Sequence, residues 1–282
     1  MITQACLRVV SAACRRFQDF PGRWRLVRWA VRNIRRTGST MGQTTVLTAH
    51  GFRFTCDLAD WIGQYVFVTG NYEEPTAALM RHLVNPGDVV VDVGANIGFF
   101  TLLLSRLVGP DGRVIAFEPM PHALERLRAH LALNHCDNVT LRECAVGSTS
   151  GTAQLYLGPR HHSSIASLQP REGAASVDVD SSTLDEALQD VATVKCVKID
   201  AEGWEPEVLA GAGRLLGGEA PPFLIAEVSD PGWPGSLIAD GFQAFIIERD
   251  GLRRIAEVRE DMGQFNALLS RQPLPPHVRL VS

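Results

Sequence analysis

From residue 88 onward, short apolar runs alternate with segments of helical spacing, and this alternation constrains the fold more than any other feature of the chain. The apolar runs predict buried strands, and a helix between two strands requires a crossover connection. Strands joined in this way form an open sheet with helices on both faces, so we predict a doubly wound α/β fold. The predicted strands are 89–93, 114–117, 139–141, 194–199, 223–228, 242–248 and 265–269, and the predicted helices are 97–108, 121–133, 183–190, 205–216 and 234–240.

Shorter signals flank and interrupt this region. Residues 44–49 and 52–58 predict a β-hairpin, and Asp250-Gly251 predicts the turn of another. Residues 72–84 have helical spacing that ends at an Asn-Pro-Gly turn. Ser182 is the expected N-cap of the helix that follows it.

The segment 147–180 has a mixed character, with short strand candidates at 155–157 and 177–179. Between them lies a loop that contains the adjacent pair His161 and His162. Histidine is the natural base near neutral pH, so this pair is a candidate for proton transfer if the loop covers a site. Exposed loop histidines without a catalytic role are the alternative.

The N-terminal region differs from the rest of the chain in charge. Residues 1–40 carry nine Arg and a single acid, Asp19, which gives a net charge of +8, so that residues 41–282 hold the remaining −12 of the total of −4. Apolar residues recur at helical spacing on both sides of Pro21-Gly22. They are Cys6, Val9, Val10, Ala13 and Phe17 before this turn, and Trp24, Val27, Val31 and Ile34 after it.

We therefore predict a basic helical arm at 1–40 and a main domain at 41–282. The apolar positions within residues 1–36 are expected to dock on the main domain as a helical cap, with the arginines facing solvent. Binding of residues 1–36 to a membrane surface is the alternative, and an Arg-rich, acid-poor leader is also typical of organelle transit peptides.

The chain has 282 residues, of which 45% are apolar and 21% charged, and this supplies enough apolar material for a sizeable core. The composition excludes a disordered chain, a collagen-like chain and a small disulfide scaffold, and no apolar run is long enough to cross a membrane. The six cysteines have neither metal-site nor disulfide spacing. The only candidate for the apolar region of a signal peptide, Val9 to Cys14, is shorter than the usual minimum, which disfavours secretion. We expect reduced thiols and a cytoplasmic protein.

A glycine loop follows the first predicted strand of the sheet. Gly94 and Gly98 flank Ala95, Asn96 and Ile97, and both glycines allow positive φ angles and a close approach of backbone to ligand. The next strand ends at Glu118, where a carboxylate can accept hydrogen bonds from both hydroxyls of a ribose. Because the carboxyl ends of parallel strands share one edge of the sheet, the two features together predict a nucleoside ligand.

The details of the loop distinguish between nucleoside ligands. A dinucleotide site requires G-x-G-x-x-G and a helix N-terminus aimed at a pyrophosphate. Here the glycines are four residues apart, and the carboxylate of Asp92 at the end of the strand repels a pyrophosphate but suits an ammonium group. S-adenosylmethionine has a ribose, an amino-acid tail and no phosphate. We therefore predict it as the cofactor, with NAD as the alternative.

Six motifs follow one another along the chain. They are, in order, VVDVGANIG at 90–98, Phe117-Glu118-Pro119, Ala145-Val146-Gly147, Thr183-Leu184-Asp185, VKIDAEGWE at 197–205, and Glu227. This series resembles the FkbM family of S-adenosylmethionine-dependent methyltransferases, over about residues 70–270 of the chain. The stretch Lys-Ile-Asp-x-Glu-Gly-x-Glu at 198–205 is the most specific of the motifs, and Ala201 stands where the family usually has valine.

The resemblance implies a class I methyltransferase sheet of seven strands with the last one antiparallel, and O-methylation of a sugar or natural-product hydroxyl. The residues that it implies at the cofactor are Asp92, Gly94, Ala95, Asn96 and Gly98 for the methionine part, Glu118 for the ribose, and Cys144-Ala145 for the adenine. Cys144 is equally explained as a small buried thiol. Glu73 and Glu74 lie upstream, where they would approach the ligand ammonium or simply complement a helix N-terminus.

A second acidic cluster follows the fourth predicted strand and therefore lies on the same edge of the sheet. Asp200 and Glu202 are the predicted catalytic residues, either as a general base for the acceptor hydroxyl or as oxygen ligands of Mg²⁺. The sequence leaves this choice open. Glu205 opens the helix 205–216 and is expected to complement its dipole.

The resulting prediction is an O-methyltransferase with a small-molecule or glycan acceptor. Trp204 and Trp233 would line the acceptor pocket or pack in the core. An NAD-dependent oxidoreductase is disfavoured by the missing third glycine, and a non-catalytic nucleoside-binding module by the presence of Asp200 and Glu202. A nucleic-acid methyltransferase is disfavoured because a polyanion would meet the net charge of −12 on residues 41–282, so we expect no nucleic-acid partner.

Overall fold

The computed structural model describes residues 4–17, 20–37, 42–158, 166–169, 173–218, 221–230 and 232–281. The chain forms two compact units. The first contains the described residues up to Glu73 together with 132–135, and the second contains the other described residues. Among the described residues, no helix is both long enough and apolar enough to cross a membrane.

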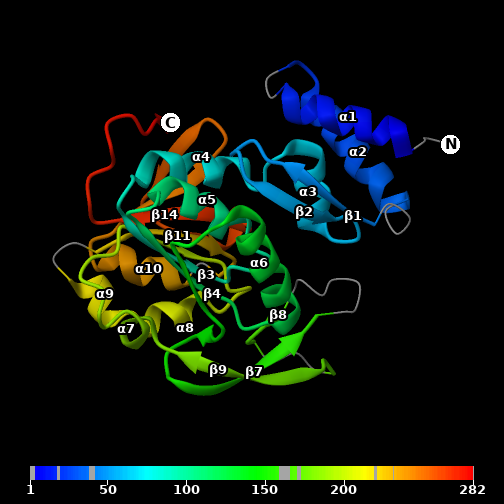
Figure 1. Ribbon diagram of the computed structural model, residues 1–282. Coiled ribbons are helices and arrows are strands. Elements are labelled where there is room, and N and C mark those ends of the chain that lie inside the picture. Colours follow the sequence, from blue (N-terminus) through cyan, green and yellow to red (C-terminus); the bar gives the residue numbers. More distant parts are fainter. Residues whose placement is uncertain are drawn as a thin grey trace. The chain divides into compact units, whose positions relative to one another are not determined.

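The second unit is built on a sheet of nine strands (Figure 1), in which five neighbouring strands are parallel. The chain enters the middle of the sheet at β3, proceeds outward to β4 and β5, and then returns to the other side of β3 as β10 and β11. Strand order therefore reverses between β3 and β10, where open α/β sheets bind their ligands. The parallel strands are β3 (Val89–Val93), β4 (Arg113–Phe117), β5 (Val139–Arg142), β10 (Cys196–Ile199) and β11 (Phe223–Val228).

Strand β14 (Phe265–Ser270) lies between β11 and β12 (Gln243–Glu248) and is antiparallel to both. This confirms the predicted doubly wound sheet of seven strands with the last one antiparallel. Two further strands, β13 (Gly251–Ile255) and β15 (Leu280–Val281), extend the β12 edge. The hairpin predicted at Asp250-Gly251 is confirmed, but its turn lies one residue earlier, at Arg249-Asp250, because Glu248 pairs with Gly251.

Helices cover both faces of this sheet (Figure 1). Val91, Val93 and Phe117 pack into a core with α8 and α10, whereas Ala116 packs with Leu127 of α6. The alternation of side chains along a strand explains why neighbouring residues reach opposite helix layers. The helices are α4 (Glu74–Leu83), α5 (Phe99–Val108), α6 (Pro121–Asn134), α7 (Leu184–Ala187), α8 (Glu205–Ala210), α9 (Gly213–Gly217) and α10 (Gly232–Ala239).

Two predicted helix boundaries are wrong for local reasons. The helix expected at 205–216 divides into α8 and α9 at Gly211, which approaches another segment so closely that a Cβ there would lie 2.1 Å from the Gly147 carbonyl oxygen. The N-cap of α7 is Thr183 rather than Ser182, because the Thr183 hydroxyl accepts a hydrogen bond from the amide of Glu186 at 3.1 Å.

A small second sheet, in the order β6-β9-β7-β8, follows β5 in the chain. Its strands are β6 (Ala145–Val146), β7 (Gly151–Leu157), β8 (Ala166–Ser167) and β9 (Ser176–Ser182), which confirms both short strand candidates. Leu155 of this sheet packs against Met120 and Ala123 at the start of α6. His161 and His162 lie outside the described residues.

The first unit contains α1 (Gln4–Arg16), α2 (Arg23–Thr37), the hairpin β1 (Gln43–Leu47) and β2 (Arg53–Asp57), and α3 (Trp61–Thr69). The helix break at Pro21-Gly22 and the hairpin agree with the prediction, whereas α3 was not predicted. Asp60 caps α3 by accepting a hydrogen bond from the Gly63 amide.

The arm packs through a different face of α1 than the sequence pattern indicated. In α2 the predicted residues Val27, Val31 and Ile34 are buried. In α1 the buried residues are instead Leu7, Ser11 and Cys14. Val9, which lies on the predicted docking face, is 69% exposed. The prediction for α1 is therefore wrong, because this helix has two apolar faces and packs through the other one.

Candidate active site

The glycine loop after β3 is held tightly between the ends of its two neighbouring strands. Gly94 has a φ of 75°, and a Cβ at this position would lie 1.9 Å from the Asp200 carbonyl oxygen, so only glycine fits. The amides of Gly94 and Ala95 donate to the Phe117 carbonyl at 3.0 and 2.9 Å. The loop therefore binds the end of β4 on one side and touches the end of β10 on the other.

Gly98 closes the same loop and is the N-cap of α5. Its φ is 91°, and a Cβ there would lie 2.3 Å from Cδ1 of Leu127 in α6. Asn96, between the two glycines, also has a positive φ, of 49°. Three left-handed residues in five give the loop a tight curve over the sheet edge, and this curve brings the Asn96 amide toward Glu118.

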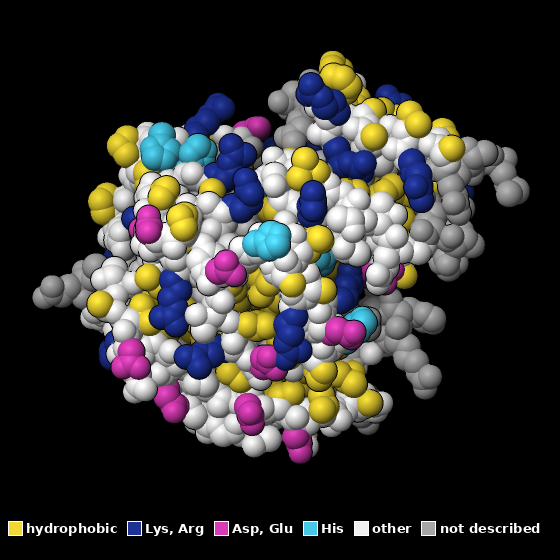
Figure 2. All heavy atoms as spheres, in the orientation of Figure 1, with side chains coloured by type: hydrophobic (Ala, Val, Ile, Leu, Met, Phe, Trp, Pro, Cys, Tyr) yellow, Lys and Arg dark blue, Asp and Glu magenta, His cyan; other side chains and the backbone are white. Residues whose placement is uncertain are grey.

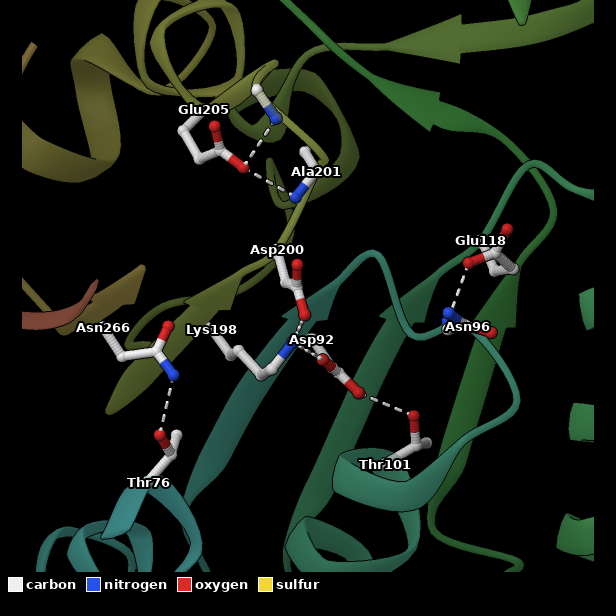
Figure 3. Close-up of polar contacts among 11 residues, drawn as sticks. Thr76, Asp92, Asn96, Thr101, Glu118, Lys198, Asp200, Ala201, Glu205 and Asn266 are labelled. Carbon is white, nitrogen blue, oxygen red and sulfur yellow. Dashed lines mark hydrogen bonds and ion pairs between the residues drawn. The ribbon is translucent and has the colours of Figure 1, made fainter. Parts of the chain in front are cut away.

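Glu118 lies directly after β4, and only 6% of it is exposed. One carboxylate oxygen accepts a hydrogen bond from the Asn96 amide at 2.7 Å (Figure 3), and the other accepts from the Met120 amide at 2.8 Å. Burial raises the pKa of Glu118 to about 7, although both amide hydrogen bonds act in the opposite direction. A carboxylate has about four acceptor positions, so two remain for hydroxyl donors.

Asp92 lies on β3 beneath the loop and is completely buried. The Thr101 hydroxyl of α5 donates to its Oδ2 at 2.7 Å. Burial raises the pKa of this carboxyl group, and Lys198 and Thr101 oppose the increase. Its predicted place at the end of the strand is therefore observed, with the carboxylate bound inside the protein.

Lys198 connects the two acids that the sequence analysis singled out. It lies on β10 directly opposite Asp92 in the strand register, and its Nζ is 3.9 Å from Asp92 Oδ1 and 3.1 Å from Asp200 Oδ2 (Figure 3). The side chain is almost fully buried, and Nζ lies 4.9 Å from the ring centroid of Phe100. Asp200 is the outer member of this cluster, with 31% of its side chain exposed.

The turn after Asp200 is fixed by Glu205, the first residue of α8. Its buried carboxylate accepts hydrogen bonds from the amides of Ala201 at 2.9 Å and Gly203 at 3.3 Å (Figure 3). Burial raises the pKa of this carboxyl group. Glu205 therefore holds the turn as well as opening the helix, as a structural residue.

Glu202 is exposed at the tip of this turn and has a φ of 52°. Its backbone carbonyl accepts a hydrogen bond from the Ser167 hydroxyl at 2.9 Å, and the Gly203 carbonyl accepts from the Gln169 side chain at 2.6 Å. The end of β8 and the residues that follow it are thus bound to the turn that carries Asp200 and Glu202. Among the described residues, no group of three His, Cys, Asp or Glu side chains is arranged to hold a metal ion.

Comparison with known proteins identifies the family. The family model described as "Methyltransferase FkbM domain" matches residues 92–256, which is more than half of the chain. The chain belongs to this family. The match begins at Asp92 and includes the glycine loop, Glu118 and the Lys198–Glu205 stretch. Methyltransferase activity of the FkbM type is thereby confirmed, and the oxidoreductase alternative is set aside.

Individual relatives match to different extents. Methyltransferase sdnD of Sordaria araneosa is 29% identical over 218 residues, which cover 65% of this chain and 81% of that protein. The 31-O-demethyl-FK506 methyltransferase FkbM of Streptomyces tacrolimicus is 43% identical over 82 residues, which cover 28% of this chain and only 31% of that protein. Among solved structures, methyltransferase FkbM from Methylobacillus flagellatus has 16% identity and a TM-score of 0.44, and the alignment covers 73% of this chain and 52% of that chain.

The other residues predicted for this FkbM-type methyltransferase follow β5 or lie in α10. Ala145 is buried at the start of β6. Cys144 before it is half-buried against the core, which raises the pKa of its thiol. Both follow Arg142, whose carbonyl accepts from the Glu118 amide at 3.1 Å. Trp233 is buried in the core.

The structure also shows site residues that the sequence analysis missed. Lys198 was noted only as a neighbour of the acids, and Thr101 was not singled out. A further contact joins Asn266 of β14 to Thr76 of α4, whose side chains are 3.1 Å apart (Figure 3). The position of Lys198 inside an otherwise apolar strand was the available signal, because a charged residue there requires a partner.

Proposed function

We propose that this FkbM-type methyltransferase transfers a methyl group from S-adenosylmethionine to a hydroxyl group of a small acceptor, such as a sugar, a glycoconjugate or another natural product. The observation that carries the proposal is the nearly buried Glu118 carboxylate, linked to the glycine loop and retaining acceptor positions for a ribose diol. The name of the Streptomyces relative, which methylates an oxygen, supports a hydroxyl acceptor. The six cysteines are all thiols rather than disulfides, which suits a reducing compartment such as the cytoplasm.

The loop fits this cofactor better than it fits a dinucleotide. The Asn96 amide, which a pyrophosphate would need, already donates to Glu118. Three carboxyl groups, those of Asp92, Glu118 and Asp200, share this part of the site with Lys198, and the excess of acid favours a cationic ligand over a phosphate. In this proposal Gly94, Ala95, Asn96 and Gly98 enclose the methionine part, Glu118 binds the ribose, and Cys144-Ala145 contact the adenine.

The acceptor side of the proposal rests on Asp200. S-adenosylmethionine supplies an electrophilic methyl group on a sulfonium. Asp200 orients the acceptor hydroxyl and takes its proton, and Lys198 holds the carboxylate in place from inside the sheet. Glu202, exposed next to it, binds the acceptor.

Two measurements test the proposal directly. Isothermal titration calorimetry should show binding of S-adenosylmethionine and none of NAD to the same protein. A screen of monosaccharides, glycosides and polyhydroxylated natural products with methyl-labelled S-adenosylmethionine should then yield a methyl ether. Binding of NAD, or labelling of RNA in place of every hydroxylated small molecule, would contradict the proposal.

Cofactor affinity should depend on the ionisation of Glu118. Ribose hydroxyls donate hydrogen bonds to a carboxylate, so S-adenosylmethionine should bind the ionised form of Glu118. In the free protein the pKa of Glu118 is about 7. We therefore expect the affinity for S-adenosylmethionine to fall as the pH is lowered through 7, by up to about tenfold per pH unit. Calorimetry in buffers of different ionisation enthalpy should show proton release on binding.

Glu118→Gln should remove this pH dependence and weaken binding at least about tenfold, because each hydrogen bond to a charged acceptor contributes about 1.5–3 kcal/mol. Glu125→Gln, at an exposed position of α6, is the matched control and should retain both properties. A Glu118→Gln protein with wild-type affinity would show that the ribose is bound elsewhere.

Methyl transfer should continue in excess EDTA. The Asp200 carboxylate already has a cationic partner in Lys198, at 3.1 Å, and the proposed proton transfer needs no second cation. Rates measured with and without EDTA, and after addition of MgCl₂, test this point. Loss of activity in EDTA and its return with magnesium would instead assign a metal to Asp200 and Glu202.

A further inference from the structure

Helix α1 in the first unit has an outer apolar face that is not used in folding. The buried residues Leu7, Ser11 and Cys14 account for its packing within the unit. Val9 and Ala13 lie on another side of the helix, and Phe17 continues their spacing of four directly after its last residue, Arg16; Val9 is 69% and Phe17 61% exposed. Exposed apolar residues scattered singly are normal, but a row at helical spacing indicates a binding surface.

The charges of α1 and α2 are all of one sign. The two helices contain nine Arg and no Asp or Glu, whereas the described acids of the first unit, Asp57, Asp60 and Glu73, lie later in the chain. Over α1, Figure 2 shows hydrophobic and arginine side chains lying next to one another. The exposed arginines are Arg8, Arg16, Arg25, Arg28, Arg32, Arg35 and Arg36.

The arginines of this unit divide into two groups by their contacts. Arg15 donates to the Phe67 carbonyl and Arg23 is buried, so both side chains belong to the interior packing of the unit. By contrast, Arg25, Arg28 and Arg32 follow one another at helical spacing on the outer side of α2, opposite its buried apolar residues. This row is exposed and leaves its charges available to an anionic partner.

Aromatic side chains accompany the arginines. The Arg16 guanidinium lies 5.7 Å from the ring centroid of Phe17, and that of Arg35 lies 4.4 Å from the ring of Trp61, which is itself 42% exposed. Arginine beside an exposed aromatic ring is typical of the interface between water and lipid headgroups, where the ring enters the acyl boundary and the cation binds phosphate.

We propose that the first unit binds the surface of an anionic membrane through the outer face of α1. Val9, Ala13 and Phe17 would enter the headgroup region, and the exposed arginines of α1 and α2 would bind lipid phosphates. A lipid surface accounts for both the exposed apolar residues and the exposed arginines. A nucleic acid would bind the arginines but would gain nothing from Val9. Helix α1 lies on the membrane rather than across it, since none of the described helices can span a bilayer.

Vesicle binding by the full chain tests this proposal. Phosphatidylcholine vesicles with about 30% phosphatidylglycerol should co-sediment with the protein, whereas vesicles of phosphatidylcholine alone should not, because each arginine contributes roughly fivefold to the partition coefficient on an anionic surface. Raising the salt concentration to about 0.5 M should weaken the binding. Equal binding to both kinds of vesicle, or to neither, would overturn the proposal.

Surface variants distinguish the two contributions. V9S/F17S should lower vesicle binding at least tenfold, and R28Q/R32Q should lower it while removing part of the salt dependence, both without a change in Tm or in S-adenosylmethionine binding. L280S changes an apolar residue of the second unit that is 57% exposed, and should bind as the wild type does.

The same variants test whether this face instead binds a second copy of the chain or a nucleic acid. If V9S/F17S binds vesicles like the wild type and dissociates a dimer in analytical ultracentrifugation, the face is an interface between copies of the chain. If R28Q/R32Q loses binding to RNA and keeps binding to anionic vesicles, the arginines serve a nucleic acid. Either result would overturn the proposal.

Discussion

Replacing Asp200 by Asn is expected to lower kcat by about two to four orders of magnitude, the range that a positioned general base contributes. The amide keeps the size of the side chain but cannot take the proton of the acceptor hydroxyl. Affinity for S-adenosylmethionine should change little, because the cofactor is assigned to the glycine loop and Glu118. The rate is measured by transfer of a labelled methyl group to the acceptor found in the screen, and the affinity by calorimetry.

Two further variants are needed to interpret this result. Asp111→Asn alters an exposed acid before β4, at the opposite edge of the sheet, and should leave kcat unchanged. Glu202→Gln should raise KM for the acceptor more than it lowers kcat, because its side chain is exposed beside the site. If Asp200→Asn retains a near-normal rate, the base lies elsewhere, and His161 and His162 become the next residues to replace.

The sheet was predictable because buried parallel strands appear in sequence as short, nearly uninterrupted apolar runs. Helix α3 was not predictable by the same reasoning. Its buried residues include Gly63 and Gln64 as well as Val66 and Phe67, so no single apolar face repeats along it. Periodicity identifies a helix that has one buried side, and α3 has more than one.

Helix α1 shows a second limit of periodicity. Leu7 and Cys14 lie on one side of it and Val9 and Phe17 on another, and both pairs fit helical spacing. The larger apolar set was predicted to be buried, but the smaller set is the one that packs. Spacing locates apolar faces, and only the shape of the neighbouring elements decides which face is covered.

The position of the site could be predicted from the ends of the strands, whereas the ion pairs of Lys198 within it could not. Glu118 and Asp200 could be placed at one sheet edge because each follows a strand. The register that sets Lys198 opposite Asp92 depends on which strands are neighbours, and the order of β3 and β10 is a property of the whole sheet. Lys198 and Lys195 are the only lysines in the chain, so a lysine within an apolar strand was nevertheless a visible exception.

Replacing Lys198 by Met should lower the free energy of unfolding by about 3–5 kcal/mol, the usual cost of removing one partner from a buried ion pair. Methionine fills a similar volume, so the loss reflects charge rather than a cavity. Asp92 would remain completely buried without its cation, and Asp200 would lose its partner at 3.1 Å. Chemical denaturation of both proteins measures the difference.

The pH dependence of this loss distinguishes an electrostatic origin from a packing defect. Burial already raises the pKa of Asp92, and without Lys198 its folded pKa should rise further above the ordinary value near 4. The folded variant then holds a proton that the unfolded chain has lost, so its stability falls as the pH rises through this interval. The deficit relative to the wild type should therefore be smallest near pH 4 and largest above pH 7. Lys195→Met is the control and should show no such trend, since Lys195 is half-buried with its Nζ 5.1 Å from the centroid of the Phe223 ring. A stability deficit in Lys198→Met that does not depend on pH would indicate lost packing instead.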